Sequence, residues 1–222
     1  MDARAQAHAS ARLEEGLLSV DRQAVASIIE SASRSEGFQA AAFADGVIVP
    51  ACTRIGDGWD AGEVTLSQMY MAARLLEEAL ASALPVSSVH AHGPVVGVAV
   101  LEDFHALGKR IVQTLLGSAG YDVRDLGAGV SCEALVERAV AERVEVLMVS
   151  VLMLNKALHV TRLSELLRAS GPNRPMLVVG GAPFRLDPDL WRRVGADAMG
   201  TSASDALRIV ADFGASRTGG SP

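Results

Sequence analysis

One stretch decides the fold: Val95-Val96-Gly97-Val98-Ala99-Val100-Leu101, which runs directly into Glu102-Asp103-Phe104-His105-Ala106-Leu107-Gly108-Lys109. The apolar part predicts a buried parallel strand, and the residues after it predict an amphipathic helix. His105 therefore lies in a strand-to-helix loop, two residues after Asp103. Open α/β sheets bind their ligands in such loops, at the carboxyl ends of the strands.

The alternation of strand and helix continues toward the C-terminus. Further strands are predicted at Tyr121–Asp125, Val146–Val149, Met176–Val179 and Ala198–Met199. Helices are predicted at Gly108–Ala119, Cys132–Glu142, Leu158–Ala169, Pro188–Val194 and Ser202–Phe213. Continuous apolar strands separated by helices predict a parallel sheet that is covered on both faces. The fold class is therefore α/β, a flavodoxin-like or Rossmann-like doubly wound parallel sheet of five strands.

The chain before Pro85 is helical in pattern and contains no convincing strand. Helices are predicted at Arg4–Leu18, Arg22–Arg34, Phe38–Ile55 and Thr65–Leu84. Asp21 is the expected N-cap of the second helix. Pro50 should perturb the third, and Gly56-Asp57-Gly58 should end it. The fourth carries an apolar stripe at Leu66, Met69, Ala73, Leu76 and Leu80.

Four helices with short connections predict a bundle. We therefore expect a four-helix bundle domain over residues 1–86 and a Rossmann-like domain over residues 93–214. The segment from Pro85 to Pro94 has no apolar periodicity and reads as the linker between them. Residues 215–222 are rich in Gly and Ser and are expected to be a disordered tail.

Composition excludes several classes of function. The net charge is −6 without a basic stripe, which argues against direct binding of nucleic acid. No apolar run approaches the length of a membrane span, and the charged N-terminus does not resemble a secretory signal. The two cysteines, Cys52 and Cys132, form no metal-ligand spacing and suit a reducing compartment. We expect a cytoplasmic protein.

The residues around the strand ends indicate a bound ligand. Asp103 can hydrogen-bond the ring nitrogen of His105 that a metal does not use, which fixes the tautomer and raises the basicity of the ligand. Glycines lie near the ends of several strands, at Gly127, Gly129, Gly180, Gly181, Gly195 and Gly200. Glycine lets a large ligand approach the backbone, so these positions predict a deep slot rather than a shallow phosphate cradle.

Asp103-x-His105-x-x-Gly108, Ser150-x-Leu152 and Gly180-Gly181, in this order, resemble the signature of cobalamin-binding domains of the methionine synthase type. The resemblance implies that His105 is the lower axial cobalt ligand and that Asp103 hydrogen-bonds it. It also implies that Ser150, Leu152, Gly180 and Gly181 line the slot that buries the displaced nucleotide tail. Leucine at Gly181 is expected to fill this slot with little loss of stability. Trp59 and Leu66 match the residues with which the helical domain caps the upper cobalt face.

The resemblance predicts cobalamin as the cofactor, with cobalt bound by His105 and no catalytic side chain. The cofactor-binding residues it implies are Trp59, Leu66, Tyr70, Asp103, Phe104, His105, Ala106, Gly108, Ser150, Leu152, Gly180, Gly181 and Thr201. The chain departs from the family pattern at Glu102, where glycine is usual, and at Ala106, where an acid is usual. Lys156 stands near the Ser or Thr that often completes the His–Asp relay, and either pairs with Asp103 or is solvated.

Gly180-Gly181-Ala182-Pro183 looks most like the small corrinoid proteins of methyltransferase systems. The resemblance implies a carrier of a methyl group on cobalt between partner methyltransferases, a component rather than a complete enzyme. The alternative is a cobalamin-dependent sensor of light or B12 that partners a transcriptional regulator. Met69-Tyr70 stands where light sensors have a Glu-His pair. Together with bulky Trp59, it predicts a preference for methylcobalamin.

Overall fold

The computed structural model describes residues 2–83 and 93–218 of the chain. The chain divides into two compact units, Met1–Val86 and Ser87–Pro222. Most of the expected linker, including His90 and His92, lies outside the described residues. No helix among the described residues has the length and apolarity needed to cross a bilayer.

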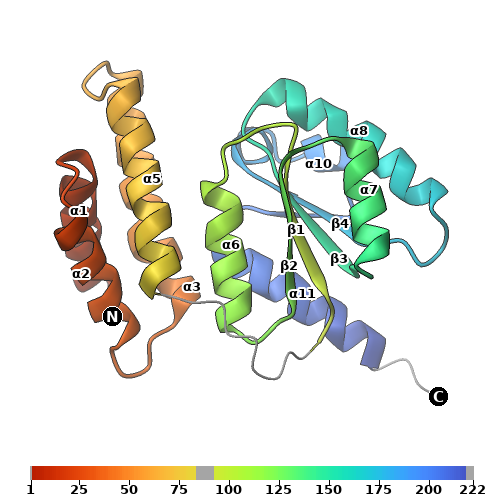
Figure 1. Ribbon diagram of the computed structural model, residues 1–222, viewed down its shortest axis with the longest axis horizontal. Helices are drawn as coiled ribbons and strands as arrows, with labels where there is room; N and C mark the ends of the chain where they lie inside the picture. The colour runs from red at the N-terminus through yellow and green to blue at the C-terminus, as the bar shows by residue number, and fades with distance from the viewer. Residues whose placement is uncertain (1, 84–92, 219–222) are drawn as a thin grey trace. The chain divides into compact units, whose positions relative to one another are not determined.

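The first unit is built from helices (Figure 1). They are α1 (Ala3–Leu18), α2 (Arg22–Ser33), α3 (Ala40–Phe43), a π-helical turn (Ala44–Ile48), α4 (Val49–Asp60) and α5 (Leu66–Ala83). Asp2 and Asp21 begin α1 and α2 by accepting hydrogen bonds from backbone N–H groups of the first turn, so the predicted cap at Asp21 is confirmed. The helices enclose a core that includes Leu13, Val25, Ile29, Val47 and Leu76.

The third helical segment is longer than the sequence predicts. Pro50 lies in the first turn of α4, where its missing N–H and fixed φ are tolerated, so the helical path continues through it. The prediction that Gly56-Asp57-Gly58 ends the segment is wrong, because α4 continues to Asp60. Gly62 follows it at φ +76°, a left-handed conformation that glycine adopts freely and that stops helices.

The last helix of this unit buries only part of the predicted stripe, namely Leu76 and Leu80. The buried face of α5 consists of Ala72, Leu75, Leu76, Glu77, Ala79 and Leu80. Leu66 at its start is 66% exposed. Thr65 and Gln68 bond each other reciprocally, backbone N–H to side-chain oxygen, which is a capping box that begins the helix.

The second unit contains a parallel five-stranded sheet in the order β2-β1-β3-β4-β5, which confirms the flavodoxin-like prediction. The strands are β1 (Val96–Leu101), β2 (Val123–Val130), β3 (Val146–Ser150), β4 (Met176–Gly180) and β5 (Ala198–Gly200). The helices are α6 (Leu107–Ser118), α7 (Cys132–Ala141), α8 (Leu154–Ala169), α9 (Ala182–Leu186), α10 (Leu190–Arg193) and α11 (Ala203–Thr218).

Each face of the sheet has its own core. Val96, Val98, Val146, Met148 and Val178 pack with residues of α6 and α11. Ala99, Leu101, Leu147, Val149 and Val179 point the other way and pack with residues of α7, α8 and α9. Alternate residues of the strands thus reach opposite layers, and the inner strands β1, β3 and β4 are largely apolar because both layers are covered. The edge strand β2 also carries the exposed residues Arg124 and Asp125.

Several boundaries differ from the predictions. β2 runs to Val130, so Gly127 and Gly129 lie within it, at φ +97° and +70°, where its register with β1 shifts. Such bulges need residues that accept positive φ. α8 starts at Leu154 rather than Leu158. The sequence gives no signal for this start, because the residue before it, Met153, forms no capping hydrogen bond with its side chain. α11 extends to Thr218, so the expected disorder is wrong for residues 215–218.

Candidate functional site

The loop after β1 holds the histidine that the sequence singled out. His105 Nδ1 lies 2.5 Å from Asp103 Oδ1, which also accepts the N–H of Phe104 at 2.6 Å. Burial raises the pKa of the Asp103 carboxyl, but the hydrogen bonds from His105 and Phe104 outweigh it, and the pKa is lowered overall. Because an ionised Asp103 can only accept, Nδ1 carries the proton, and Nε2 keeps a lone pair for a metal.

The two side chains of this pair differ sharply in exposure. The carboxylate of Asp103 is 7% exposed, whereas the imidazole of His105 is 61% exposed. Asp103 Oδ2 is buried and has no hydrogen-bond partner among the described residues. The pair therefore consists of an accessible ligand atom backed by a buried carboxylate with unused acceptor capacity, which fits the cobalt of a cobalamin.

The backbone of β2 fixes this loop. Gly129 N–H donates to the carbonyl oxygen of Asp103 at 2.7 Å. Gly129 has φ +70°, which glycine adopts freely, and a Cβ there would come within 2.6 Å of the Phe104 ring and force the ring to move. The ring itself remains 80% exposed, which leaves an apolar surface beside His105.

Three small residues form a row across the carboxyl edge of the sheet. Ser150 pairs in register with Gly180, and Gly180 with Gly200. They continue the alternation of residues that face α6 and α11. A Cβ at Gly108 in α6 would lie 3.2 Å from Ser150 Oγ, and one at Gly200 would lie 3.6 Å from Asp205 Cβ in α11. The row therefore lies next to the first turns of these two helices.

Gly181 has a different role from the expected one. It adopts φ +116°, and a Cβ there would lie 1.9 Å from the carbonyl oxygen of Val151. The expectation that a side chain at Gly181 would cost little stability is wrong, because the protein's own backbone occupies that space. Gly200 has no such contact and is the better position for probing the edge of the sheet.

Lys156 does not pair with Asp103, one of the two alternatives that the sequence left open, but with the neighbouring Glu102. Lys156 Nζ lies 3.1 Å from Glu102 Oε2, and His159 Nδ1 lies 2.6 Å from the same oxygen. Both partners come from α8. The hydrogen bond from His159 is the main reason why the pKa of Glu102 is lowered, and Lys156 adds to it. His159 follows Glu102 by 57 residues, so no local signal could have revealed this cluster.

The remaining predicted residues of this unit surround the same edge. Ala106 immediately precedes α6, and Leu152 lies in the loop after β3 with 46% of its side chain exposed. Thr201 follows β5 and donates both its N–H and its hydroxyl to Asp205 Oδ2. The structure thus gathers these predicted residues at the carboxyl ends of the strands: Asp103, Phe104, His105, Ala106, Gly108, Ser150, Leu152, Gly180, Gly181 and Thr201.

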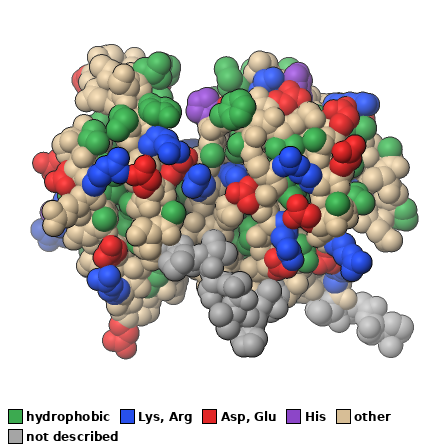
Figure 2. Space-filling model, viewed as in Figure 1, with side chains coloured by type: hydrophobic (Ala, Val, Ile, Leu, Met, Phe, Trp, Pro, Cys, Tyr) green, Lys and Arg blue, Asp and Glu red, His purple; other side chains and the backbone are tan. Residues whose placement is uncertain are grey.

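The predicted cap residues lie in the helical unit and are exposed within it. Trp59 in α4 is 47% exposed, and Leu66 and Tyr70, one turn apart in α5, are 66% and 65% exposed. Figure 2 shows hydrophobic side chains on the surface of this unit, at the end where α4 connects to α5 in Figure 1. These residues therefore present apolar surface that their own unit does not bury.

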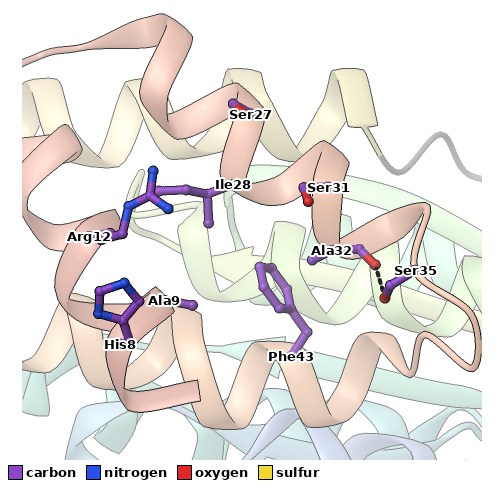
Figure 3. A pocket seen from close by; sticks show the side chains of 9 residues that line it. All are labelled: His8, Ala9, Arg12, Ser27, Ile28, Ser31, Ala32, Ser35 and Phe43. Carbon is purple, nitrogen blue, oxygen red and sulfur yellow. Dashed lines mark hydrogen bonds between the residues drawn. The ribbon is translucent and has the colours of Figure 1, made fainter. Parts of the chain in front are cut away.

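The helical unit also has a cavity of about 340 Å³ between α1, α2 and α3. Figure 3 shows Phe43 and Ile28 at its apolar side and His8 and Arg12 from α1 at its rim. None of the predicted cofactor-binding residues lines it. The described residues also contain no cluster of three or more His, Cys, Asp or Glu side chains that could hold a metal ion by themselves.

An α/β sheet with a carboxylate-backed histidine after its first strand, preceded in the chain by a helical unit, defines a cobalamin-binding architecture. Residues 93–211 match the family model of the B12 binding domain, and residues 9–83 match a second model with the same description. The chain belongs to the B12-binding domain family.

Curated relatives extend this assignment. Monomethylamine corrinoid protein 1 of Methanosarcina acetivorans is 33% identical over 170 residues, which are 72% of this chain and 77% of that protein. Dimethylamine corrinoid protein 2 of Methanosarcina mazei is 28% identical over 201 residues, 88% of this chain and 92% of that protein. The predicted resemblance to corrinoid proteins of methyltransferase systems is thus confirmed.

A solved structure shares the fold. The monomethylamine corrinoid protein of Methanosarcina barkeri superposes with a TM-score of 0.72 at 22% identity, over 90% of this chain and 96% of that one. The fold predicted from the sequence is therefore confirmed.

Proposed function

We propose that this protein is a corrinoid protein that carries a methyl group on cobalt between partner methyltransferases. The observation that carries the proposal is the Asp103–His105 pair, with Nδ1 bound to a buried carboxylate and Nε2 free. Bound cobalamin supplies a cobalt centre that accepts a methyl group and gives it up again. The chain supplies the lower ligand, the binding slot and the cover.

His105 is the lower axial ligand in this proposal. Asp103 holds the proton on Nδ1, so that the other ring nitrogen is always the one presented to cobalt. The buried carboxylate also stabilises positive charge on the imidazole, which ties the strength of ligation to the charge on the metal. Phe104, Ala106 and Gly108 lie next to the ligand and bound the surface on which the corrin rests.

The row of small residues forms the slot for the nucleotide tail. Ser150, Gly180 and Gly200 keep the carboxyl edge of three neighbouring strands free of bulk. Leu152 and Thr201 lie beside this row, and Gly181 shapes the turn after β4. A tail bound there would be held by backbone and by small polar side chains, which can approach it closely.

Trp59, Leu66 and Tyr70 cover the upper face of the corrin. Covering the cofactor with these side chains is favourable, because it removes their exposed apolar surface from water. A methyl group is small enough to share that space, whereas an adenosyl group would displace the indole of Trp59. We therefore propose methylcobalamin as the preferred form.

The methyl donor and acceptor are bound by partner proteins. This role is supported by relatives named for monomethylamine and dimethylamine, and by a neighbour of the same fold within a methanol:cobalamin methyltransferase complex from Methanosarcina barkeri. These relatives favour the carrier over the cobalamin-dependent sensor. The upper face must become accessible in each transfer, so the cover has to move aside.

His105→Ala tests the assignment of the ligand. The variant should still take up methylcobalamin, but its visible spectrum should change to that of a water-ligated form. In the reduced cobalt(II) state, the nitrogen splitting in the EPR spectrum should disappear. His8→Ala, which removes an exposed histidine of the helical unit, is the matched control and should keep both signals. Unchanged splitting in His105→Ala would refute the assignment.

Methyl transfer tests the carrier role. The reduced cobalt(I) protein is mixed with 13C-labelled methylamines, methanol or an aryl methyl ether, each with its purified methyltransferase. One of them should place the label on the bound corrinoid, where NMR detects it. Absence of label on the corrinoid with every donor and its methyltransferase would contradict the carrier role.

A further inference from the structure

Glu102 is an unusual residue for its position. It is the first residue after β1 and has φ +48°, a left-handed conformation that residues with a Cβ disfavour. Glycine adopts this conformation without penalty, and the cobalamin-binding signature usually has glycine here. A glutamate can remain there only if other contacts compensate.

Contacts from two elements provide this compensation. From α8, Lys156 and His159 both bind Glu102 Oε2, and the Glu102 side chain is 26% exposed. From β2, the carbonyl oxygen of Val130 accepts the Glu102 N–H at 3.1 Å. The residue is therefore held both by its backbone and by its carboxylate.

The backbone conformation of Glu102 affects the loop that carries His105. Asp103 is the next residue, and its carbonyl oxygen is fixed by Gly129. The backbone angles at Glu102 set the direction in which Asp103 leaves the strand, and Asp103 in turn orients His105. The loop carries no regular hydrogen-bonding ladder of its own between Glu102 and α6, so its geometry depends on such anchors.

We propose that Glu102, anchored by Lys156 and His159, is a positioning residue that holds the strained turn and thereby sets the Asp103–His105 pair for cobalt ligation. The inference rests on the proposed function, since it concerns the ligand that this function assigns. The lowered pKa of Glu102 supports it, because the anchor is a carboxylate that remains ionised.

Three substitutions at Glu102 separate the effect of its backbone conformation from the effect of its charge. Glu102→Ala removes the anchor but keeps a Cβ in the left-handed turn. Glu102→Gly removes the same anchor but also the strain. Glu102→Gln keeps the length and the capacity to accept hydrogen bonds but loses the charge. Lys156→Met and His159→Gln weaken the anchor from the side of α8.

The first measurement is the ratio of His-ligated to water-ligated cobalt, from the visible spectrum of bound methylcobalamin and the EPR spectrum of the cobalt(II) form. Glu102→Ala should lower this ratio by roughly tenfold, the effect expected when a disfavoured left-handed residue is released. Glu102→Gly should stay within about twofold of the parent, because glycine occupies the turn without an anchor. The variants at Lys156 and His159 should fall between them.

The second measurement needs no cofactor. In the protein without cobalamin, 15N NMR of the His105 ring reports how completely Nδ1 carries the proton, and this bias should follow the same order. Equal loss in Glu102→Ala and Glu102→Gly would overturn the proposal, because the carboxylate would then act by its charge. Parent-like behaviour of both variants would overturn it as well.

These outcomes are distinguishable from failure of the proposed function. If the parent spectrum shows no dependence on His105, the ligand assignment fails. The ring NMR series in the cofactor-free protein still decides whether Glu102 sets the geometry of the pair. If His105 ligates cobalt but the Glu102 variants match the parent in both the ligation ratio and the ring NMR, only the positioning role is refuted.

Discussion

The two units of this chain hold their predicted cofactor-binding residues in opposite ways. In the α/β unit, Asp103 and His105 are bonded to each other, and the loop around them is fixed to β2 and α8. In the helical unit, Trp59, Leu66 and Tyr70 are about half to two-thirds exposed. The part of the proposed site in the α/β unit is thus preorganised. The part in the helical unit is apolar surface that this unit does not bury itself.

This difference separates two kinds of contribution to cofactor binding. Preorganised polar groups lose little on binding, because their orientation is already fixed by hydrogen bonds. Exposed apolar groups contribute only when the ligand buries them. We therefore expect ligation of cobalt to depend on the α/β unit alone, and discrimination between upper ligands to depend on the helical unit.

Gly181→Leu and Gly200→Val test which glycines of the α/β unit serve the fold and which serve the ligand. Leucine at Gly181 meets the Val151 carbonyl at a positive φ and should destabilise the protein by about 3 kcal/mol or more. Thermal unfolding of the cofactor-free protein should then begin about 6–12 °C lower.

A Cβ at Gly200 meets only ordinary contacts, of which Asp205 Cβ at 3.6 Å is the nearest. The variant Gly200→Val should therefore melt near the parent temperature but bind methylcobalamin more weakly, because its side chain fills the row of small residues. Titration of the folded variant measures that loss. Parent-like affinity in folded Gly200→Val would remove Gly200 from the slot.

The sequence predicted the regular part of this architecture well. Apolar runs and their spacing identified each strand of the sheet, because both faces of a parallel sheet are buried and leave a strong pattern. The order of the strands was found only in the structure. Asp103 and His105 were identified for a related reason, since they lie two residues apart and directly after an obvious strand.

The failures lie where distant residues decide the outcome. Gly181 is constrained by Val151, and Glu102 is anchored by residues more than fifty positions away. The positions of Gly127 and Gly129 inside β2 depend on a register shift against β1. Periodicity and spacing describe neighbours along the chain, so they contain no information on such contacts.

Trp59→Ala tests the contribution of the helical unit. The native protein should prefer methylcobalamin over adenosylcobalamin by roughly 5- to 150-fold, which corresponds to about 1–3 kcal/mol for crowding the indole once it covers the cofactor. The variant should lose most of this preference and release the methyl group faster in light. His105 should still ligate cobalt in it, as the spectrum would report. Equal affinity of the native protein for both forms would contradict the role of the cover.

The smallest expected effect concerns the start of α11, which lies beside Gly200. The Ser202 hydroxyl oxygen accepts the N–H of Asp205, and Asp205 Oδ2 accepts the N–H and the hydroxyl of Thr201. Together the side chains of Ser202 and Asp205 form the N-terminal cap of the helix. Burial raises the pKa of Asp205, but the bonds from Thr201 and Arg208 outweigh it and lower the pKa to about 2. Asp205→Ala should therefore cost about 1 kcal/mol at neutral pH.

Because the folded-state pKa of Asp205 is depressed, its contribution is complete above the usual carboxyl range and is lost as the pH falls from about 4 toward 2. The difference in unfolding free energy between the parent and Asp205→Ala should shrink over that interval, as denaturant titrations would measure. Asp21→Ala removes the corresponding cap of α2 and should affect the helical unit instead. Cobalt ligation should be unchanged in both variants, since neither cap touches the Asp103–His105 loop. A shift in the His-ligated fraction in Asp21→Ala alone would show that the helical unit contributes to ligation, and the division of labour between the two units would have to be abandoned.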